Sequence, residues 1–383
     1  MQEEQIGIRC VYMRGGTSKG CYLLRKDLPE EQELMEKVIL RLYGSPDDRQ
    51  IDGMGGADPL TSKVAIVEPS ARDDADVAYT FGQVGINKQQ ISYGGNCGNM
   101  LSGIGPFAID QGLVPMTRPV TTVRIYNTNT DQIIHAEVPV SGNGPAVAGD
   151  GIVSGVPGTG AVIKLNFLGC EGSMTGKLLP TGNAKDIVEV NGKSVEVSLV
   201  DAATPFVFVR GESIGMTGKE LPEDLIANPE YMERLETIRS WAAVQTGRVT
   251  DASEATDLSP NVPRVAFVTA PVDYETSEGK IIHGKDVTVL ARQMSMQKPH
   301  RTYAVTGSIC TSAAAEIPGT VVNEAAVKRG ETIVIGHPSG VIEVDAKVTL
   351  DGKNLSIDKV GVVRTARKIM EGTVFIPKET FST

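Results

Sequence analysis

The stretch Ser62–Val67, with the sequence SKVAIV, decides how this chain of 383 residues is built, because a similar stretch returns in its second half. The second copy is Pro263–Val268, with the sequence PRVAFV. Each copy precedes a segment that contains one cysteine, Gly95–Asn99 (GNCGN) in the first half and Gly307–Ser312 (GSICTS) in the second. Motifs repeated in the same order indicate a duplicated structural unit. The sequence therefore predicts two similar lobes that face each other across a cleft.

The duplication extends upstream of these motifs. Residues 17–24 (TSKGCYLL) lead to Leu-Pro-Glu-Glu at 28–31, and residues 204–209 (TPFVFV) lead to Leu-Pro-Glu-Asp at 221–224. A length of 383 residues is comfortable for two domains. We therefore expect an N-terminal lobe over residues 1–184 and a C-terminal lobe over residues 185–362, with residues 363–383 returning to the first lobe.

The local sequence favours an α+β fold. Short β-branched runs bounded by Gly, Pro, Asn or Asp predict strands at residues 120–125, 161–165, 195–197, 287–290 and 332–335. Helical patterns are fewer and are predicted over residues 28–43, 100–111, 222–245 and 311–317. The first of them follows Asp27, a capping residue, and has Pro29 in its first turn. Residues 141–160 are rich in Ser, Gly, Asn and Pro and predict a surface loop.

The composition argues against several classes of protein. The net charge of −10 argues against nucleic acid as the main partner, so an anionic substrate needs a local concentration of positive charge. The five cysteines are widely spaced with no CxxC pair, which is typical of a reducing, cytoplasmic protein with free thiols. Residues 1–5 are acidic and do not resemble a signal peptide, and no apolar run is long enough to span a membrane. The sequence leaves a homodimer as an open alternative to a monomer.

Cys97 and Lys63 stand out as candidates for chemistry. Cys97 is flanked by glycines and precedes a predicted helix, so its thiol should lie among uncovered N–H groups, where thiols ionise more readily. The alternative is a buried small hydrophobe, the commonest fate of a free cysteine. Lys63 begins an apolar run and lies near a glycine-rich loop, Gly53–Asp58, and the second copy has Arg264 at the equivalent position. A desolvated lysine can act as a base near neutral pH, although a solvent-facing lysine at a strand end is the alternative.

Two further segments are candidates for binding an anionic substrate. Residues 13–20 (MRGGTSKG) lack the spacing of a nucleotide-binding P-loop, but small hydroxyl residues and bare amides suit a carboxylate. In the second half, several cationic residues lie just before Cys310. They are candidates for binding an anionic substrate, and the alternative is that they form a charged turn exposed to solvent. The cationic residues there are Arg292, Lys298, His300 and Arg301.

The sequence lacks the motifs of metal sites, serine hydrolases and dinucleotide-binding sites. The four histidines are scattered, with no HxxxH and no Cys/His cluster, so we expect no metal site. The chain has no GxSxG motif of a serine hydrolase, and no GxGxxG follows an early strand as a dinucleotide site requires. We therefore expect an activity that needs no cofactor.

Three motifs closely resemble the PrpF family: residues 12–20 (YMRGGTSKG), 61–67 (TSKVAIV) and 96–100 (NCGNM). That family contains 2-methylaconitate isomerase, methylitaconate and aconitate Δ-isomerases, and 4-oxalomesaconate tautomerase, and the resemblance covers the whole chain. The wider superfamily is similar to diaminopimelate epimerase and proline racemase. The resemblance implies two pseudo-symmetric lobes, each a curved β-sheet or barrel around a central helix, with the active site in the cleft between the lobes.

The resemblance also implies cofactor-independent proton movement in a small unsaturated di- or tricarboxylate. A lysine and a cysteine that match Lys63 and Cys97 face the substrate in this family, and the lysine is the stronger catalytic candidate. Lys63, neutral in the closed cleft, would remove an allylic proton, and backbone N–H donors near Cys97 would hold the extended enolate. The proton would return at the other end of the allyl system, or rotation in the intermediate would give cis–trans isomerisation. We expect the substrate to be bound by Arg14, Thr17, Ser18, Met54, Asn96, Gly98, Asn99, Arg292, Lys298, His300, Ser308 and Cys310.

Two other classes of function stay open. The first is an amino-acid racemase or epimerase that uses one thiol from each lobe, Cys97 and Cys310. The chain departs from the racemases at Thr311 and Ser312, which replace glycines of their second motif. The second is a non-enzymatic accessory protein of a carboxylate pathway, which has no use for Lys63 and a glycine-framed Cys97.

Overall fold

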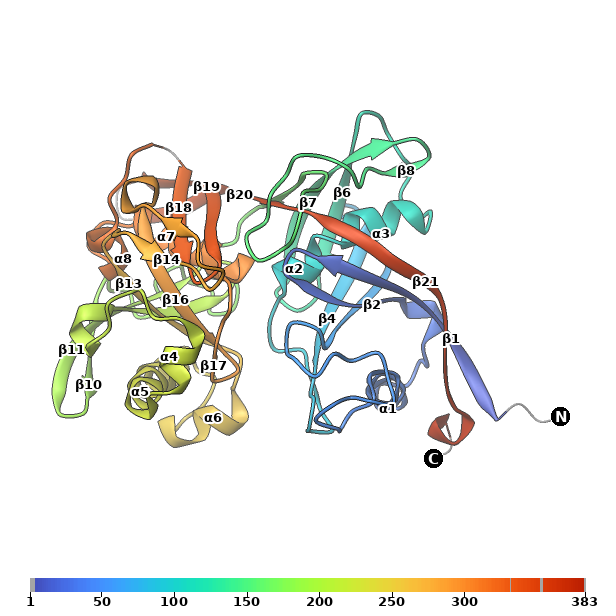
Figure 1. The fold of residues 1–383 in the computed structure, drawn as a ribbon, viewed down its shortest axis with the longest axis horizontal. Helices are drawn as coiled ribbons and strands as arrows, with labels where there is room; N and C mark the ends of the chain where they lie inside the picture. The colour runs from blue at the N-terminus through green and yellow to red at the C-terminus, as the bar shows by residue number, and fades with distance from the viewer. Residues whose placement is uncertain (1–3, 331, 352–353, 382–383) are drawn as a thin grey trace. The chain divides into compact units, whose positions relative to one another are not determined.

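The structure, a computed structural model, describes residues 4–330, 332–351 and 354–381 and divides into two compact units. The first unit comprises Met1–Leu165 together with Arg364–Thr383, and the second comprises Asn166–Val363. The C-terminal segment joins the first unit because strand β21 (Ala366–Pro377) pairs antiparallel with β1 (Gln5–Gly15) (Figure 1). Among the described residues, no helix is long and apolar enough to cross a membrane.

The chain passes from the first unit to the second after Leu165, earlier than the boundary at residue 184 expected from the sequence. The intervening residues belong to the second unit because Asp201, the last residue of β11 (Lys193–Asp201), holds them. The buried Asp201 carboxylate accepts hydrogen bonds from Ser173 Oγ (2.7 Å), Met174 N (2.9 Å) and Thr175 N (2.8 Å). The polar residues near 184 thus form a turn inside the second unit, where the Thr181 hydroxyl donates to Asp186.

In the first unit the main sheet has the strand order β21-β1-β2-β3-β4-β6-β7. After the β1–β21 pair, the pairings are antiparallel, parallel, antiparallel, parallel and antiparallel in turn. Parallel neighbours need a crossover connection, and helices supply it here. The strands are β2 (Ser18–Leu24), β3 (Lys63–Pro69), β4 (Val77–Val84), β6 (Val120–Asn127) and β7 (Gln132–Ser141). The crossover helices are α1 (Gln32–Tyr43), between β2 and β3, and α2 (Gly98–Leu101) with α3 (Ile104–Asp110), between β4 and β6.

The second unit repeats this arrangement. Its sheet has the order β11-β12-β13-β16-β18-β19, and the pairings again alternate antiparallel, parallel, antiparallel, parallel and antiparallel. The strands are β12 (Pro205–Arg210), β13 (Arg264–Thr269), β16 (Val289–Ser295), β18 (Thr332–His337) and β19 (Gly340–Asp351), with β10 (Asp186–Val190) and β20 (Asn354–Arg364) pairing outside them. The crossover helices are α4 (Pro222–Ile226) with α5 (Pro229–Gln245), and α7 (Val305–Glu316) with α8 (Val321–Ala325). The matching topology confirms the duplication predicted from the sequence.

The two faces of the first sheet carry different helices (Figure 1). Val64 and Ile66 of β3 belong to the apolar cluster that α1 covers. Successive side chains of a strand point to opposite faces, so Lys63 and Ala65 lie on the other face. That face carries α2 and α3, since Tyr22 of β2, which also lies outside the α1 cluster, donates its hydroxyl to Met100 O at 2.6 Å. Lys63 therefore lies on the α2–α3 side of the sheet.

The second sheet follows the same rule. Val265 and Phe267 of β13 pack with the α5 cluster, so Arg264 lies on the face that carries α7. Helix α7 is buried over all but its last residue, Glu316, and packs on β11, β12, β18 and β19. It therefore forms the central helix that the predicted fold class requires.

The predicted helices differ from the observed ones at their ends and at internal breaks. The predicted helix over residues 28–43 begins at Gln32, that over 100–111 is interrupted after Leu101, and that over 222–245 is divided before Pro229. The largest difference is α7, which begins at Val305 and not at Thr311. Its first turn contains β-branched residues and Gly307, which have low helix propensity, and burial of the helix outweighs that preference. The short elements are β5 (Ile91–Ser92), β8 (Gly144–Pro145), β9 (Ile163–Phe167), β14 (Tyr274–Glu275), β15 (Ile281–Ile282), β17 (Lys298–Pro299) and α6 (Ala255–Leu258).

Candidate active site

Lys63 is a buried lysine with a defined partner. It is the first residue of β3 and the direct register partner of Gln83 in β4, and each residue is only 8% exposed. Lys63 Nζ donates a hydrogen bond to Gln83 Oε1 at 2.5 Å. The same nitrogen lies 5.2 Å from the centroid of the Phe81 ring. The structure therefore places an amine in an enclosed environment, against the alternative of a solvent-facing lysine.

The backbone of Lys63 is held by its neighbours. The parallel strand β2 passes so close that a Cβ on Gly20 would lie 1.7 Å from the Lys63 carbonyl oxygen. The Tyr43 hydroxyl, at the end of α1, donates to the same oxygen and accepts from Cys21 N at 2.9 Å. Burial raises the pKa of Tyr43 well above its ordinary value, so the phenol keeps its proton and remains a donor. Two strands and one helix thus fix where the lysine side chain starts.

The glycine-rich loop near Lys63, Gly53–Asp58, packs on the protein's own atoms. A Cβ on Gly55 would lie 2.2 Å from the side-chain amide carbon of Gln50. Gln50 Oε1 accepts hydrogen bonds from Ser62 Oγ (2.7 Å) and Ala57 N (2.9 Å). Gln50 therefore connects the loop, through Ala57, to Ser62, the residue before Lys63. Met54, expected at the substrate, is half-buried and packs against the α1 cluster.

Cys97 lies on the same side of the sheet as Lys63. It is the N-cap residue of α2, which packs against β1, β2 and β3, and it is partly exposed. The Tyr79 hydroxyl donates to Cys97 O at 3.5 Å. Tyr79 and Gln83 are four residues apart in β4, so their side chains share one face. One face of β4 therefore supports both the cysteine segment and the lysine.

Buried polar atoms without protein partners gather around the cysteine segment and the loop at residues 15–18. Both polar side-chain atoms of Asn96, Asn99 Oδ1 and Ser18 Oγ are buried and make no hydrogen bond. The Asn99 Nδ2 amide group donates to Thr17 Oγ1 at 2.9 Å, which connects the two segments. A buried polar group without a partner costs about 1–3 kcal/mol. A polar ligand or an ordered water satisfies such a group, so these residues suit a hydrogen-bonding substrate.

Two arginines border this cluster. Arg14 donates to Gly16 O and Thr365 O, both at 2.9 Å, so its guanidinium shapes the loop. Burial lowers the pKa of Arg364 to about 10, so it remains cationic at neutral pH. A Cβ on Gly16 would lie 2.1 Å from Asn99 Oδ1 and 3.3 Å from Arg364 Cδ, which places Arg364 beside Asn99. Arg364 is not among the residues predicted from the sequence, although an arginine at the end of an apolar run (VGVVR, residues 360–364) is a detectable signal.

The second unit has a corresponding polar group beside α7. Arg264 lies at the topological position of Lys63 and is 8% exposed. Both polar side-chain atoms of Gln293 and the Thr306 hydroxyl are buried and make no hydrogen bond. A Cβ on Gly307 would lie 2.4 Å from Gln293 Oε1, so the amide of Gln293 reaches the first turn of α7. Gln293 and Thr306 are not among the residues predicted from the sequence, because no motif marks them.

The structure separates the cationic residues that the sequence grouped at 292–301. Arg292 is buried, and its guanidinium donates to Glu220 O (2.8 Å), Ala291 O (3.0 Å) and Gly336 O (3.2 Å). Burial lowers the pKa of Arg292 to about 10. Lys298 is exposed on β17, and His300 Nδ1 accepts from Thr302 N at 3.1 Å. The guanidinium of Arg292 therefore connects backbone segments by hydrogen bonds to their carbonyl oxygens, while Lys298 faces solvent.

Ser308 and Cys310 are internal residues of α7. The Ser308 hydroxyl donates to Val305 O at 2.8 Å, and Cys310 Sγ lies 3.3 Å from Val200 O. Burial raises the pKa of the Cys310 thiol well above its ordinary value. Cys97 is the N-cap residue of its helix, and the N-cap residue of α7 is Ala304. Cys97 and Cys310, which match in the sequence motifs, therefore occupy different positions in their helices: Cys97 lies before the first turn of α2 and Cys310 lies inside α7.

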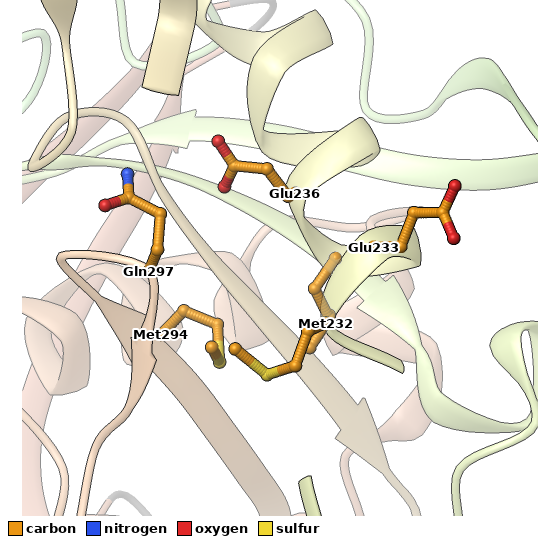
Figure 2. A pocket seen from close by; sticks show the side chains of 6 residues that line it. Met232, Glu233, Glu236, Met294 and Gln297 are labelled. Carbon is orange, nitrogen blue, oxygen red and sulfur yellow. The ribbon is translucent and has the colours of Figure 1, made fainter. Parts of the chain in front are cut away.

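A pocket of about 250 Å³ lies elsewhere in the second unit. It is lined by Met232, Glu233, Leu235, Glu236, Met294 and Gln297. Figure 2 shows the side chains of Met232 and Met294 pointing toward each other and the Glu233 carboxylate pointing away from them. The Glu236 carboxylate forms an ion pair with Arg239 at 2.6 Å. Within the described part of the chain, no three His, Cys, Asp or Glu side chains are grouped as a metal site would require.

Comparison with known proteins relates the whole chain to one family. Residues 5–377 match the family described as "PrpF protein". The 3-methylitaconate isomerase of Eubacterium barkeri is 48% identical over 378 residues, which cover 98% of each chain. The 4-oxalomesaconate tautomerase of Pseudomonas putida is 40% identical over 380 residues, again 98% of each chain.

Solved structures give the same relationship. A methylitaconate Δ-isomerase matches with a TM-score of 0.84 at 46% identity and covers 100% of this chain and 98% of its own. A hydroxyproline epimerase from Agrobacterium vitis shares the fold alone, with a TM-score of 0.56 at 12% identity over 98% of this chain and 93% of its own. These similarities confirm the diaminopimelate epimerase-like fold class expected from the sequence.

Proposed function

Since this chain belongs to the PrpF family, we propose that it is a cofactor-independent isomerase that moves a proton within a small unsaturated di- or tricarboxylate. The proposed substrates are methylitaconate, 2-methylaconitate, aconitate and 4-oxalomesaconate. Methylitaconate is favoured, because the relative named for that activity is 48% identical and the relative named for 4-oxalomesaconate is 40% identical. We place the enzyme in the cytoplasm, since all five of its cysteines are free thiols.

The observation that carries the proposal is the enclosed Lys63 with a neutral hydrogen-bond partner, Gln83, at 2.5 Å. In the proposed reaction the amine takes a proton from the carbon next to the double bond, so a C–H bond breaks and an N–H bond forms. The electron pair delocalises through the double bond into a carboxylate. The ammonium then returns its proton to the far carbon of the allyl system, which shifts the double bond and regenerates the amine. No electron is gained or lost, so no redox partner is needed.

The polar cluster of the first unit supplies partners for the substrate's charge. Asn96 and Ser18 have unused hydrogen-bonding atoms, and Arg364 adds a buried positive charge beside Asn99. Hydrogen bonds between a carboxylate and charged donors are stronger than those between neutral groups. We assign these residues to one carboxylate of the substrate and to the enolate that develops from it.

The two-thiol racemase is the less favoured alternative. Such an enzyme needs two ionisable thiols that reach the substrate. Cys97 is partly exposed, but Cys310 is buried within α7, where burial keeps its thiol protonated. An intact Lys63 in an enclosed position argues further for the proton shift.

Proton exchange in D₂O tests the proposal. The enzyme is incubated separately with each of the four acids, and deuterium incorporation is followed by NMR at both allylic positions. We expect exchange and double-bond movement with at least one acid, and the same rate after exhaustive dialysis against a chelator. Exchange of the α-proton of a chiral amino or imino acid, with none at the allylic carbons of any of the four acids, would refute the proposal and favour the racemase.

A further inference from the structure

We propose that Gln83 is a positioning residue for Lys63: its amide oxygen fixes the place of Nζ and, because the amide carries no charge, leaves the lysine able to work as a neutral amine. The inference rests on the proposed function, in which Lys63 is the base. Nothing in the sequence motifs marks Gln83, which lies between the Lys63 motif and the Cys97 motif. The assignment comes from the pairing of β3 with β4, which makes the two residues direct neighbours.

The orientation of the Gln83 amide is fixed by its other contacts. Gln83 Nε2 donates to Ser62 O at 2.9 Å and to Pro59 O at 3.2 Å. A carbonyl oxygen only accepts, so the nitrogen of the amide must be on that side and the oxygen must face Lys63. Both carbonyls belong to the segment just before β3, which Gln50 holds through Ser62. The acceptor of the lysine is therefore preorganised by the backbone that leads into the lysine.

The chemical type of the acceptor matters as much as its position. A carboxylate at this distance would favour the ammonium form, and a base must be unprotonated to accept a proton. An amide oxygen accepts a hydrogen bond from either form and adds no negative charge. The Phe81 ring, 5.2 Å from Nζ, is the contact that favours the ammonium, which forms when the proton is taken up. Gln83 and Phe81 together therefore suit an amine that alternates between the two forms.

The titratable groups on the strands and helices packed around Lys63 include buried thiols and phenols. They include Cys21 and Tyr22 on β2, Tyr43 on α1, Tyr79 on β4 and Cys97 at the start of α2. Burial raises the pKa of Cys21, Tyr43 and Tyr79 well above their ordinary values, so these three groups are neutral near pH 7. A new carboxylate at position 83 would thus be a large change in the charge around the lysine.

The variant Gln83→Glu tests this, because it keeps the shape of the side chain and adds one negative charge, while an oxygen replaces the Nε2 donor. We expect the acid limb of the kcat profile to move to higher pH by about one unit or more, with the rate recovering toward the wild-type value in alkaline solution. Gln90→Glu is the matched control, since it adds the same charge to an exposed side chain in the segment that follows β4. Its profile should coincide with that of the wild type. A Gln83→Glu enzyme with an unmoved acid limb, or with a low rate at every pH, would overturn the proposal.

A second variant and a second readout keep the test independent of folding and of the proposed reaction. Gln83→Met removes the acceptor without adding charge, and we expect a fall in kcat of at least about tenfold with KM within about threefold. Wild-type kcat in Gln83→Met would overturn the proposal. The reaction of Lys63 with acetic anhydride, followed by mass spectrometry against pH, reports the unprotonated amine without any substrate. Gln83→Glu should delay this acetylation to higher pH even if all four acids prove not to be substrates, so failure of the function and failure of the Gln83 role are distinguishable.

Discussion

Gly20 and Lys63 are register partners in the parallel β2–β3 pair, and a Cβ on Gly20 would lie 1.7 Å from the carbonyl oxygen of Lys63. Strands β2 and β3 can therefore approach this closely only because Gly20 has no Cβ atom. The Tyr43 hydroxyl occupies the other side of the same oxygen. The position of the proposed base thus depends on a residue whose own side chain is a single hydrogen atom.

Gly20→Ala should displace Lys63 and destabilise the fold. Forcing one extra carbon into a packed site typically costs about 1–3 kcal/mol, and the strand that moves carries the proposed base. We expect a lower free energy of unfolding in urea and a reduced kcat. Gly372→Ala is the control, since a Cβ there has no neighbour closer than Met370 Cε at 3.9 Å. Equal effects of the two substitutions would contradict the argument.

Lys63→Ala should lower kcat by about 10²- to 10⁴-fold on the best substrate, the range typical for loss of a general base. Steady-state kinetics with circular dichroism measure the rate and the fold. Lys88→Ala, at an exposed lysine after β4, should leave both unchanged. Near-full turnover of Lys63→Ala would remove the lysine from the mechanism.

Cys97 should be the first cysteine to react with iodoacetamide, and bound substrate should slow that reaction. The other four cysteines, Cys10, Cys21, Cys170 and Cys310, are buried. Burial also raises the pKa of Cys170 to about 12, and the thiolate is the reactive form. Peptide mapping after timed alkylation measures the order. Cys97→Ala should keep measurable activity, because the lysine carries the proton; complete loss would instead give the thiol an essential role.

Cys310→Ala should keep its activity within a few-fold of the wild type and lose about 1 kcal/mol of stability, because it removes one buried sulfur atom from α7. Turnover and urea unfolding are measured on the same preparation. Abolished turnover in a folded Cys310→Ala protein would revive the two-thiol racemase.

The ionised Asp76 carboxylate should stabilise the folded protein at pH values above its ordinary pKa of 3.8. Burial acts to raise the pKa of Asp76, but hydrogen bonds from the Arg124 side chain and backbone outweigh it, and the pKa lies below its ordinary value of 3.8. The stabilisation is therefore present above pH 3.8 and is lost as the pH falls through the lower, folded-state value. Urea unfolding between about pH 5 and pH 2 should show a smaller loss of stability for Asp76→Asn than for the wild type. Asp48→Asn, at an exposed aspartate, should match the wild type; a change equal to that of Asp76→Asn would contradict the assignment.

The sequence predicted the duplication and the residues at strand starts. Motifs of the type Lys63–Val67 and Arg264–Val268 recur because both units begin the same strand with a cation and continue it with apolar residues that face two packed layers. It also placed Cys97 directly before a helix. These features are local, since they depend on composition and spacing within a few residues. For the same reason, the match of Cys97 to Cys310 failed, because short glycine-containing segments look alike wherever their helix begins.

Only the tertiary structure decided which distant residues complete the candidate site. Gln83 meets Lys63 through strand pairing, and Arg364 reaches Asn99 because the C-terminal segment returns to the first unit. The cationic residues at 292–301 are close in sequence but have different environments in the fold. Arg292 is buried and donates to backbone carbonyls, whereas Lys298 is exposed to solvent. The sequence by itself therefore determined the repeated unit and its catalytic candidates. The residues that position these candidates are set by strand register and burial, which pair residues far apart along the chain.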